Sequence, residues 1–245
     1  MTAPWTRQLA RVGALVLLSA LALELAFALR IAAMRFVDPQ STSFQRSEAW
    51  RLLTQKGHIA WSQTWVDGNR ISPNLARAVI ASEDAGFVEH GGVDWDAVES
   101  AWEKNQRAEL RSAGAPRPGK PAPKVVGGST ISQQLAKNLL LSGERTLARK
   151  GQEFLLTLML EALLSKQRIL EIYLNSVEWG EGVFGAQAAA QHYFRSDASR
   201  LGAEQAARLA VMLPAPKRFE KRPGSAYVVG RAATIVARMG AVELP

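Results

Sequence analysis

The sequence contains no cysteine and only three histidines among its 245 residues. The absence of cysteine excludes disulfides, thiolate catalysis and cysteine-ligated metals, but it does not locate the protein, since exported proteins can also lack disulfides. The histidines, His58, His90 and His192, are too widely spaced for a zinc motif. Acidic residues are fewer than basic ones, and the resulting net charge of +8 favours anionic partners such as phosphorylated substrates, anionic lipid or nucleic acid.

A long apolar run stands near the start of the chain. Residues 12–29 carry a single charge, Glu24. As a helix this stretch would be about 27 Å long, close to the roughly 30 Å hydrocarbon core of a bilayer. We therefore predict a transmembrane helix within an N-terminal membrane anchor, residues 1–37. A cleaved signal peptide is the alternative, because residues 26–28 have the small-x-small form of a cleavage site. A buried helix of a soluble domain is a third interpretation, disfavoured because an apolar run this long is rarely a core element.

The rest of the chain predicts one mainly α-helical domain. Residues 38–70 are a polar juxtamembrane connector, in which residues 57–66 alternate weakly and predict a short extended segment. From residue 71 to 245 the apolar spacing is helical, with no internal repeat and no βαβ alternation. Three polar residues are placed to cap helices: Ser72, Asp94 and Ser129.

Two stretches of this domain have more than one interpretation. Residues 104–124 hold four prolines and a net charge of +5, which predicts a mobile basic loop. It is either a solvated linker or an arm beside an anionic substrate or membrane. Residues 154–164 are apolar nearly all round but too short to span a bilayer, and we predict a buried central helix in preference to an interfacial lipid contact.

Carboxylates gather at one predicted helix boundary. Glu83 ends an apolar helical run just before a glycine-containing turn. Partial burial there would raise its pKa and make it a proton acceptor or donor near neutral pH. Taken alone, the same pattern also fits a solvated turn.

A second group of candidate residues is mostly basic and follows a Gly-Gly-Ser-Thr turn. That turn lacks the lysine of a Walker motif, so nucleotide hydrolysis is disfavoured. The i, i+4 pair of Arg149 and Glu153 fits either a surface ion pair, worth about 0.3–0.5 kcal/mol, or a cationic pocket for a diphosphate. The group consists of Lys137, Arg145, Arg149, Lys150 and Glu153.

Four strings stand in the order of the four motifs of the peptidoglycan glycosyltransferases, the family of the polymerising domains of class A penicillin-binding proteins. The strings are EDAGFVEHGGVD, GGSTISQQLAKN, RKGQE and KQRILEIYLN. The resemblance runs from about residue 71 to 219, and no transpeptidase segment follows. The chain therefore resembles the monofunctional, membrane-anchored members of the family. It departs from the usual pattern at Ala85 and Gly86, where basic or bulky residues are common.

This resemblance implies a lysozyme-like helical fold and an activity that joins lipid II units into glycan strands, with release of undecaprenyl diphosphate. Glu83 would be the general base for the acceptor hydroxyl. Glu153 would orient nearby cations or a metal. The leaving diphosphate would be stabilised by Lys137 and Arg145, with support from Arg149 and Lys150. The groove would be lined by Ser132, Gln133 and Gln134.

The resemblance also implies partners and a location. Lipid II, the growing glycan chain, the membrane and other cell-wall synthesis proteins are the expected partners, and nucleic acid is not. The expected location is the bacterial inner membrane, crossed once, with the catalytic domain on the periplasmic side. No cofactor is expected to be required and no metal site is predicted, although a diphosphate would attract a divalent cation such as Mg²⁺.

The alternative function is that of a lytic transglycosylase or muramidase acting on finished glycan, and a third is a membrane-tethered scaffold without activity. The basic group favours transfer, because an anionic leaving group needs positive charge more than it needs a proton. A hydrolase that cuts a sugar–sugar bond usually carries two carboxylates beside that bond.

Overall fold

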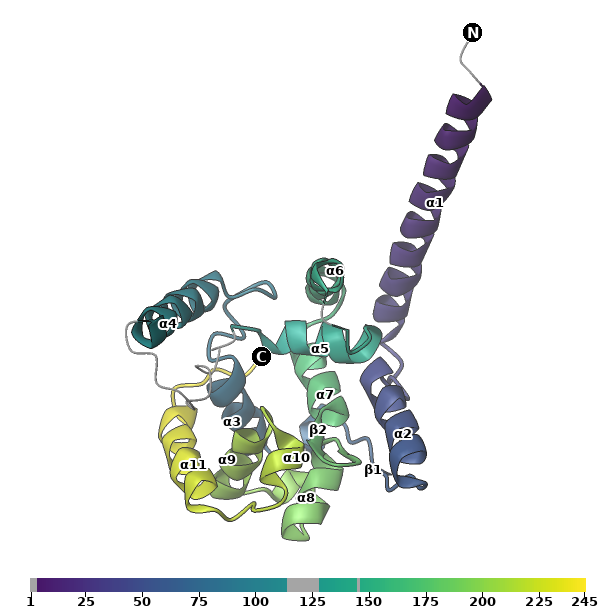
Figure 1. Cartoon of the computed structure of the whole chain (residues 1–245). Helices are drawn as coiled ribbons and strands as arrows, with labels where there is room; N and C mark the ends of the chain where they lie inside the picture. Colours follow the sequence, from purple (N-terminus) through teal and green to yellow (C-terminus); the bar gives the residue numbers. More distant parts are fainter. Residues whose placement is uncertain (1–3, 114–127, 145) are drawn as a thin grey trace.

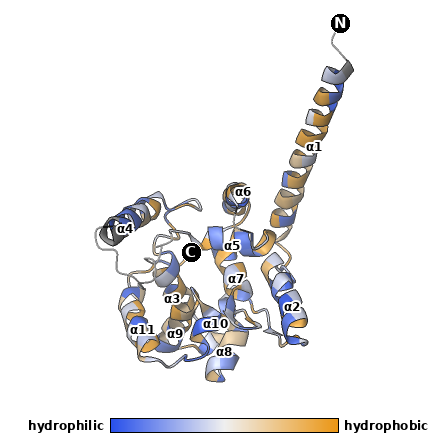
Figure 2. Cartoon of the chain, in the orientation of Figure 1, coloured by the Kyte–Doolittle hydropathy of each residue, from blue (hydrophilic) through white to orange (hydrophobic). Residues whose placement is uncertain are grey.

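Helix α1, Pro4–Ala33, extends away from the rest of the molecule (Figure 1). The computed structural model describes residues 4–113, 128–144 and 146–245. Most apolar side chains of α1 are exposed, and hydrophobic residues cover much of its length (Figure 2). Within the described ranges it is the one helix long and apolar enough to cross a membrane. The predicted N-terminal apolar helix is thus confirmed.

The C-terminal end of α1 is packed into the domain. Ile31 and Met34 are buried in the main core. The guanidinium of Arg168 donates a hydrogen bond to the backbone oxygen of Met34 at 2.8 Å. Further up the helix, the Glu24 carboxylate accepts a hydrogen bond from Gln152 at 2.8 Å. Apolar and polar contacts therefore both fix α1 to the domain.

Helix α2, Ser43–Lys56, corrects the prediction for residues 38–70, which contained only an extended segment. Thr42 and Gln45 form a capping box at its start, and the helix packs against α5. It was missed because two of its three buried residues are polar, so the sequence shows no apolar stripe. The extended segment is confirmed as strand β1, Ser62–Gln63.

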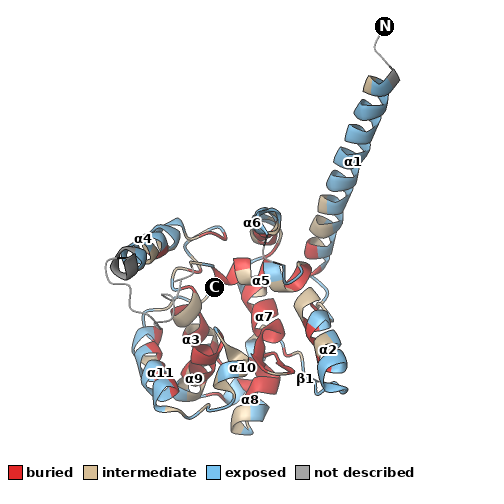
Figure 3. Ribbon diagram, viewed as in Figure 1, coloured by how far each residue is buried: buried red, intermediate tan, exposed pale blue. Residues whose placement is uncertain are grey.

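The remaining core is helical, with one small sheet. Helix α3 packs on α9, which also packs on α11, and Figure 3 shows buried residues concentrated in α3, α7 and α9. Strand β3, Val183–Phe184, lies between β1 (parallel) and β2 (antiparallel, Glu178–Gly180). The predominance of helix confirms the mainly α class. The core helices are α3 (Pro73–Glu83), α7 (Lys166–Ser176), α8 (Ala186–Phe194), α9 (Ala203–Met212) and α11 (Ala226–Met239). Short helical segments are Gly68–Arg70, Ala198–Arg200 and α10 (Pro216–Phe219).

Helix α4, Trp95–Ala113, starts as predicted but continues further. Asp94 caps it, since its carboxylate accepts a hydrogen bond from the amide of Ala97 at 2.8 Å. Residues 104–113 are helical, so the prediction that a loop begins at residue 104 is wrong. Residues 104–113 contain no proline or glycine and are mostly good helix formers, so the helix continues through them. The four prolines of the predicted loop all come later in the sequence. The remainder of the predicted loop, residues 114–124, lies outside the described ranges.

Helices α5, Ile131–Leu140, and α6, Leu147–Leu163, pack against each other and carry most of the predicted site. Thr130, not Ser129, caps α5, because its hydroxyl accepts a hydrogen bond from the amide of Gln133. The two residues are adjacent and equally suited to capping, so composition cannot separate them.

The prediction of a buried central helix for residues 154–164 is wrong. One face of α6 is buried, but Phe154, Leu155 and Leu158 are 38 %, 45 % and 41 % exposed. An apolar sequence suits both a protein core and a lipid surface, so composition alone cannot distinguish them. Figure 1 shows α6 on the side of the domain from which α1 emerges.

Candidate active site

Asp84 connects the end of α3 to the start of α5. Its carboxylate accepts a hydrogen bond from the amide of Ile131 at 2.9 Å, and its other oxygen lies 2.8 Å from Nε2 of His90. The residue is buried. These bonds hold the preceding residue, Glu83, beside α5. Sequence reasoning missed the role of Asp84, because its bonding partner on α5 lies 47 residues away.

The Glu83 carboxylate is half-buried and oriented by Gln134 of α5. The Gln134 side chain donates a hydrogen bond to Oε2 of Glu83 at 3.0 Å. Burial raises the pKa of Glu83, and the negative charge of Asp84 adds to this effect, whereas hydrogen bonds from Gln134 and Ser82 oppose it. Glu83 opens onto a pocket of about 280 Å³ between α3, α4 and the turn before α5. A carboxylate with a raised pKa beside a cavity can accept a proton from a bound hydroxyl.

The predicted cations gather around Glu153 of α6. Its buried carboxylate pairs with Arg149 at 2.8 Å and with Lys150 at 2.5 Å. Lys137 faces this group from α5. Desolvation lowers the pKa of Lys137, as does repulsion from Arg149 and Lys150, while attraction to Glu153 opposes the change. The described residues place no carboxylate within ion-pair distance of Lys137, which leaves its charge available to an anion.

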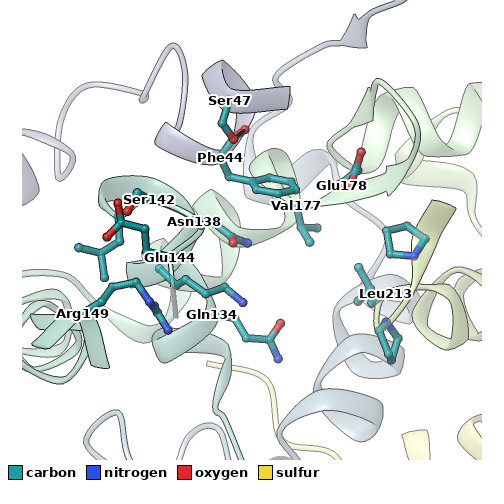
Figure 4. A pocket seen from close by; sticks show the side chains of 15 residues that line it. Phe44, Ser47, Gln134, Asn138, Ser142, Glu144, Arg149, Val177, Glu178 and Leu213 are labelled. Carbon is teal, nitrogen blue, oxygen red and sulfur yellow. Dashed lines mark hydrogen bonds between the residues drawn. The ribbon is translucent and has the colours of Figure 1, made fainter. Parts of the chain in front are cut away.

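A cleft of about 510 Å³ runs past these cations. Gln134, Lys137 and Arg149 line it, and Figure 4 shows Gln134 and Arg149 on one side of the opening with Leu213 on the other. The two hollows share no lining residue, but Gln134 links them, because it lines this cleft and donates a hydrogen bond to Glu83, which lines the smaller pocket. The structure brings the predicted base and two of the predicted cations to adjoining hollows along α5.

Other predicted site residues lie elsewhere. Ser132 is fully buried and donates a hydrogen bond to Glu161 at 2.5 Å, and Gln133 closes the capping box of α5. Neither lines the two hollows, because both side chains lie on the buried face of α5. Lys150 and Glu153 also lie off the cleft wall, and the ion pair of Glu153 with Arg149 connects them to it. Arg145 lies outside the described residues, and its role stays a prediction.

Glu178 is a cleft residue that sequence reasoning missed. It belongs to β2, lines the larger cleft and is only 6 % exposed. Burial raises its pKa to about 7; attraction to Lys217 opposes the increase, and repulsion from Glu48 adds to it. Its position in a short apolar strand gave no sign of a cleft wall. The only signal that could have found Glu178 is its acidic side chain, because the other two residues of this buried strand are a tryptophan and a glycine.

Replacing Glu178 with glutamine should change how stability depends on pH. Folding raises the pKa of Glu178, so the folded protein favours the protonated side chain. The stability that Glu178 contributes is therefore fully present below the ordinary glutamate pKa and is lost as the pH rises through about 7. Above about pH 8 we expect Glu178→Gln to increase the free energy of unfolding by at most about 3 kcal/mol, with no gain below about pH 4. Urea unfolding across this pH range measures the difference.

Glu181→Gln is the matched control, with the opposite sign. Ion pairs with Lys56 and Arg51 lower the pKa of Glu181 to about 2, so its contribution is present above the ordinary glutamate pKa and is lost as the pH falls. Glu181→Gln should therefore destabilise the protein at neutral pH. Parallel pH profiles for the two variants would contradict the expected effect of burying Glu178.

In the described parts of the chain, no group of three or more His, Asp or Glu residues is arranged to hold a metal ion. Both carboxylate oxygens of Glu153 are engaged by Arg149 and Lys150. Glu153 is therefore better placed to orient Arg149 and Lys150 than to bind a metal ion.

A helical domain that links a half-buried carboxylate to a cation-lined cleft has the features of a group-transfer enzyme with an anionic leaving group. Comparison with known families agrees with this class: the family model described as Transglycosylase matches residues 52–240. The chain belongs to the transglycosylase family. This confirms the family predicted from the four motifs.

Three relatives named biosynthetic peptidoglycan transglycosylase are similar over nearly the whole chain. The protein of Paraburkholderia phytofirmans is 50 % identical over 240 residues, which are 98 % of this chain and 94 % of the relative. That of Paraburkholderia xenovorans is 51 % identical over 234 residues, or 95 % and 92 % of the two chains. That of Burkholderia multivorans is 52 % identical over 241 residues, or 98 % and 93 %.

Proposed function

We propose that this protein polymerises lipid II into glycan strands and releases undecaprenyl diphosphate. The observation that carries the proposal is the hydrogen bond between Gln134 and Glu83, which joins the pocket of the base to the cation-lined cleft. The names of the relatives support the same substrate class.

In the proposed reaction, Glu83 accepts the proton of the 4-hydroxyl of the acceptor sugar. The freed oxygen attacks the anomeric carbon of the donor and inverts it, while the bond from that carbon to the diphosphate breaks. The electron pair leaves on the diphosphate oxygen, where Lys137 and Arg149 stabilise the developing charge. Glu153 orients Arg149, with Lys150 in support, and Arg145 is a further predicted contact. A divalent cation such as Mg²⁺ would reach this site bound to the diphosphate. The proton transfer and the stabilisation of charge are assigned to side chains of the protein.

Cleavage of finished glycan is less well supported. Enzymes that hydrolyse a sugar–sugar bond usually use a second carboxylic acid beside that bond. The neighbour of Glu83, Asp84, is unsuitable because the amide of Ile131 and the ring of His90 occupy its two oxygens. The cationic wall suits a diphosphate and has no use in such a hydrolysis.

We further propose that the anchor, residues 1–37, is retained and crosses the bacterial inner membrane once, with the domain from residue 71 to 245 on the periplasmic side. The contact between Glu24 and Gln152 supports retention, since cleavage near residues 26–28 would remove it. The exposed apolar face of α6 suits a lipid surface beside α1. Residues 38–70 connect the two parts, and helix α2 joins this connector to the domain by packing on α5. Other cell-wall synthesis proteins remain predicted partners.

Separate incubations of the purified protein with lipid II and with finished glycan test the proposal. We expect new glycan strands and released undecaprenyl diphosphate in the first and no cleavage in the second. Cleavage of glycan without polymerisation would indicate the lytic alternative. No reaction with either substrate would indicate a scaffold.

A further inference from the structure

A chain of two hydrogen bonds leads from the protein core to Glu83. The hydroxyl of Tyr173 donates to Oε1 of Gln134 at 2.9 Å, and the Nε2 of Gln134 donates to Oε2 of Glu83 at 3.0 Å. Tyr173 is only 1 % exposed and lines neither of the two hollows. The three residues lie on three helices, α7, α5 and α3, so the chain depends on how the domain is packed.

The direction of this chain matters because the two ends of a glutamine amide are similar in size and opposite in polarity. Only the NH₂ end of Gln134 stabilises an ionised Glu83, and its carbonyl end would repel it. Burial raises the pKa of Tyr173 well above its ordinary value, with added repulsion from Glu83 and Asp84, so the phenol keeps its proton and remains a donor. A phenol that donates to Oε1 leaves the NH₂ end facing Glu83.

We propose that Tyr173 and Gln134 are positioning residues for the base, in which the phenol fixes the orientation of the amide and the amide fixes the carboxylate of Glu83. This inference rests on the proposed function, because it assumes that Glu83 accepts a proton from the acceptor sugar. It assigns a role in catalysis to a tyrosine that lines neither hollow.

Loss of the phenol should raise the pH that is needed to ionise Glu83. Without its hydroxyl partner the Gln134 amide can rotate, and its carbonyl end then faces Glu83 for part of the time. A hydrogen bond to the ionised form lowers the pKa of a carboxylate, so its loss raises the pKa of Glu83 further. The base works when ionised, so activity on the acid side should be lost at a higher pH than in the wild type.

The test uses the full-length protein, lipid II and three variants: Tyr173→Phe, Gln134→Met and the double variant. For Tyr173→Phe we expect kcat to fall about tenfold, with KM for lipid II little changed and the acid limb of kcat/KM moved to higher pH. Gln134→Met should lose at least as much. The double variant should be no slower than Gln134→Met alone, because the phenol acts through the amide.

Tyr193→Phe is the matched control. It also removes a partly buried phenol with one hydrogen bond, donated to the backbone oxygen of Trp179 at 2.8 Å, and Tyr193 lines neither hollow. It should polymerise lipid II like the wild type. Thermal unfolding of all variants shows whether each is folded. If Tyr173→Phe does not fold, the test is whether the acid limb of kcat/KM moves to higher pH in Gln134→Met.

Two results would overturn the inference while the wild type polymerises lipid II normally. One is an unmoved acid limb in the folded variants. The other is a double variant whose loss equals the product of the two single losses, which indicates independent structural effects. If the wild type itself fails to polymerise lipid II, the proposed function is wrong, and the two failures are thereby distinguished.

Discussion

Replacing Glu83 with glutamine should abolish glycan polymerisation, with kcat lowered by about a hundredfold to ten-thousandfold. Glutamine keeps the size of the side chain and its contact with Gln134, but it cannot accept the proton of the acceptor hydroxyl. The initial rate of lipid II consumption measures the effect. Glu89→Gln is the control, since it removes an exposed carboxylate from the same segment outside both hollows.

The same variant should not lose stability. Because burial raises the pKa of Glu83, keeping this residue ionised at neutral pH costs folding free energy, and that cost disappears below the ordinary glutamate pKa. At neutral pH Glu83→Gln should therefore unfold at the same temperature as the wild type or higher. A variant that polymerises normally, or one that is inactive because it is unfolded, would contradict the assignment of Glu83 as the base.

Replacing Lys137 with alanine should lower kcat by about a hundredfold to a thousandfold, as expected for loss of one group that stabilises charge in the transition state. Arg149 keeps its pairing with Glu153 in this variant, so the cleft retains its shape but loses the cation that lacks a carboxylate partner among the described residues. The measurement is kcat with lipid II, together with the unfolding temperature.

Lys221→Ala is the control for Lys137→Ala, because Lys221 is an exposed lysine outside both hollows. Both variants should unfold at nearly the wild-type temperature. If Lys137→Ala alone unfolds early, Lys137 has a structural role and the diphosphate must bind elsewhere in the cleft.

Local signals predicted the local features of this fold. Ser72 and Asp94 cap the helices predicted for them, because the signal and its result lie within one helical turn. The long apolar run predicted α1, because length and composition are sufficient for that judgement. Helix α2 was missed because its buried residues Gln45 and Glu48 are polar and pack through hydrogen bonds and ion pairs.

The sequence motifs named several residues that the structure places at the two hollows, but they did not give the arrangement of these residues. The motifs named Glu83, Gln134 and Lys137, whereas their grouping depends on tertiary contacts such as the bond from Ile131 to Asp84. The same motif placed Ser132 and Gln133 in the groove, although the helix turns them inward. Tyr173 belongs to the fourth motif, but the sequence gives it no role, since a buried tyrosine is an ordinary core residue until its hydroxyl partner is known.

The firm attachment of α1 to the domain limits how the enzyme can meet its substrates. The hydrogen bonds of Glu24 with Gln152 and of Arg168 with the backbone of Met34 restrict rotation of the domain relative to α1. With α1 crossing the membrane as proposed, the opening of the cleft would keep a constant tilt and height above the lipid headgroups. Donor molecules that diffuse sideways within one leaflet would arrive in a single orientation, so reorientation in three dimensions would not slow each addition.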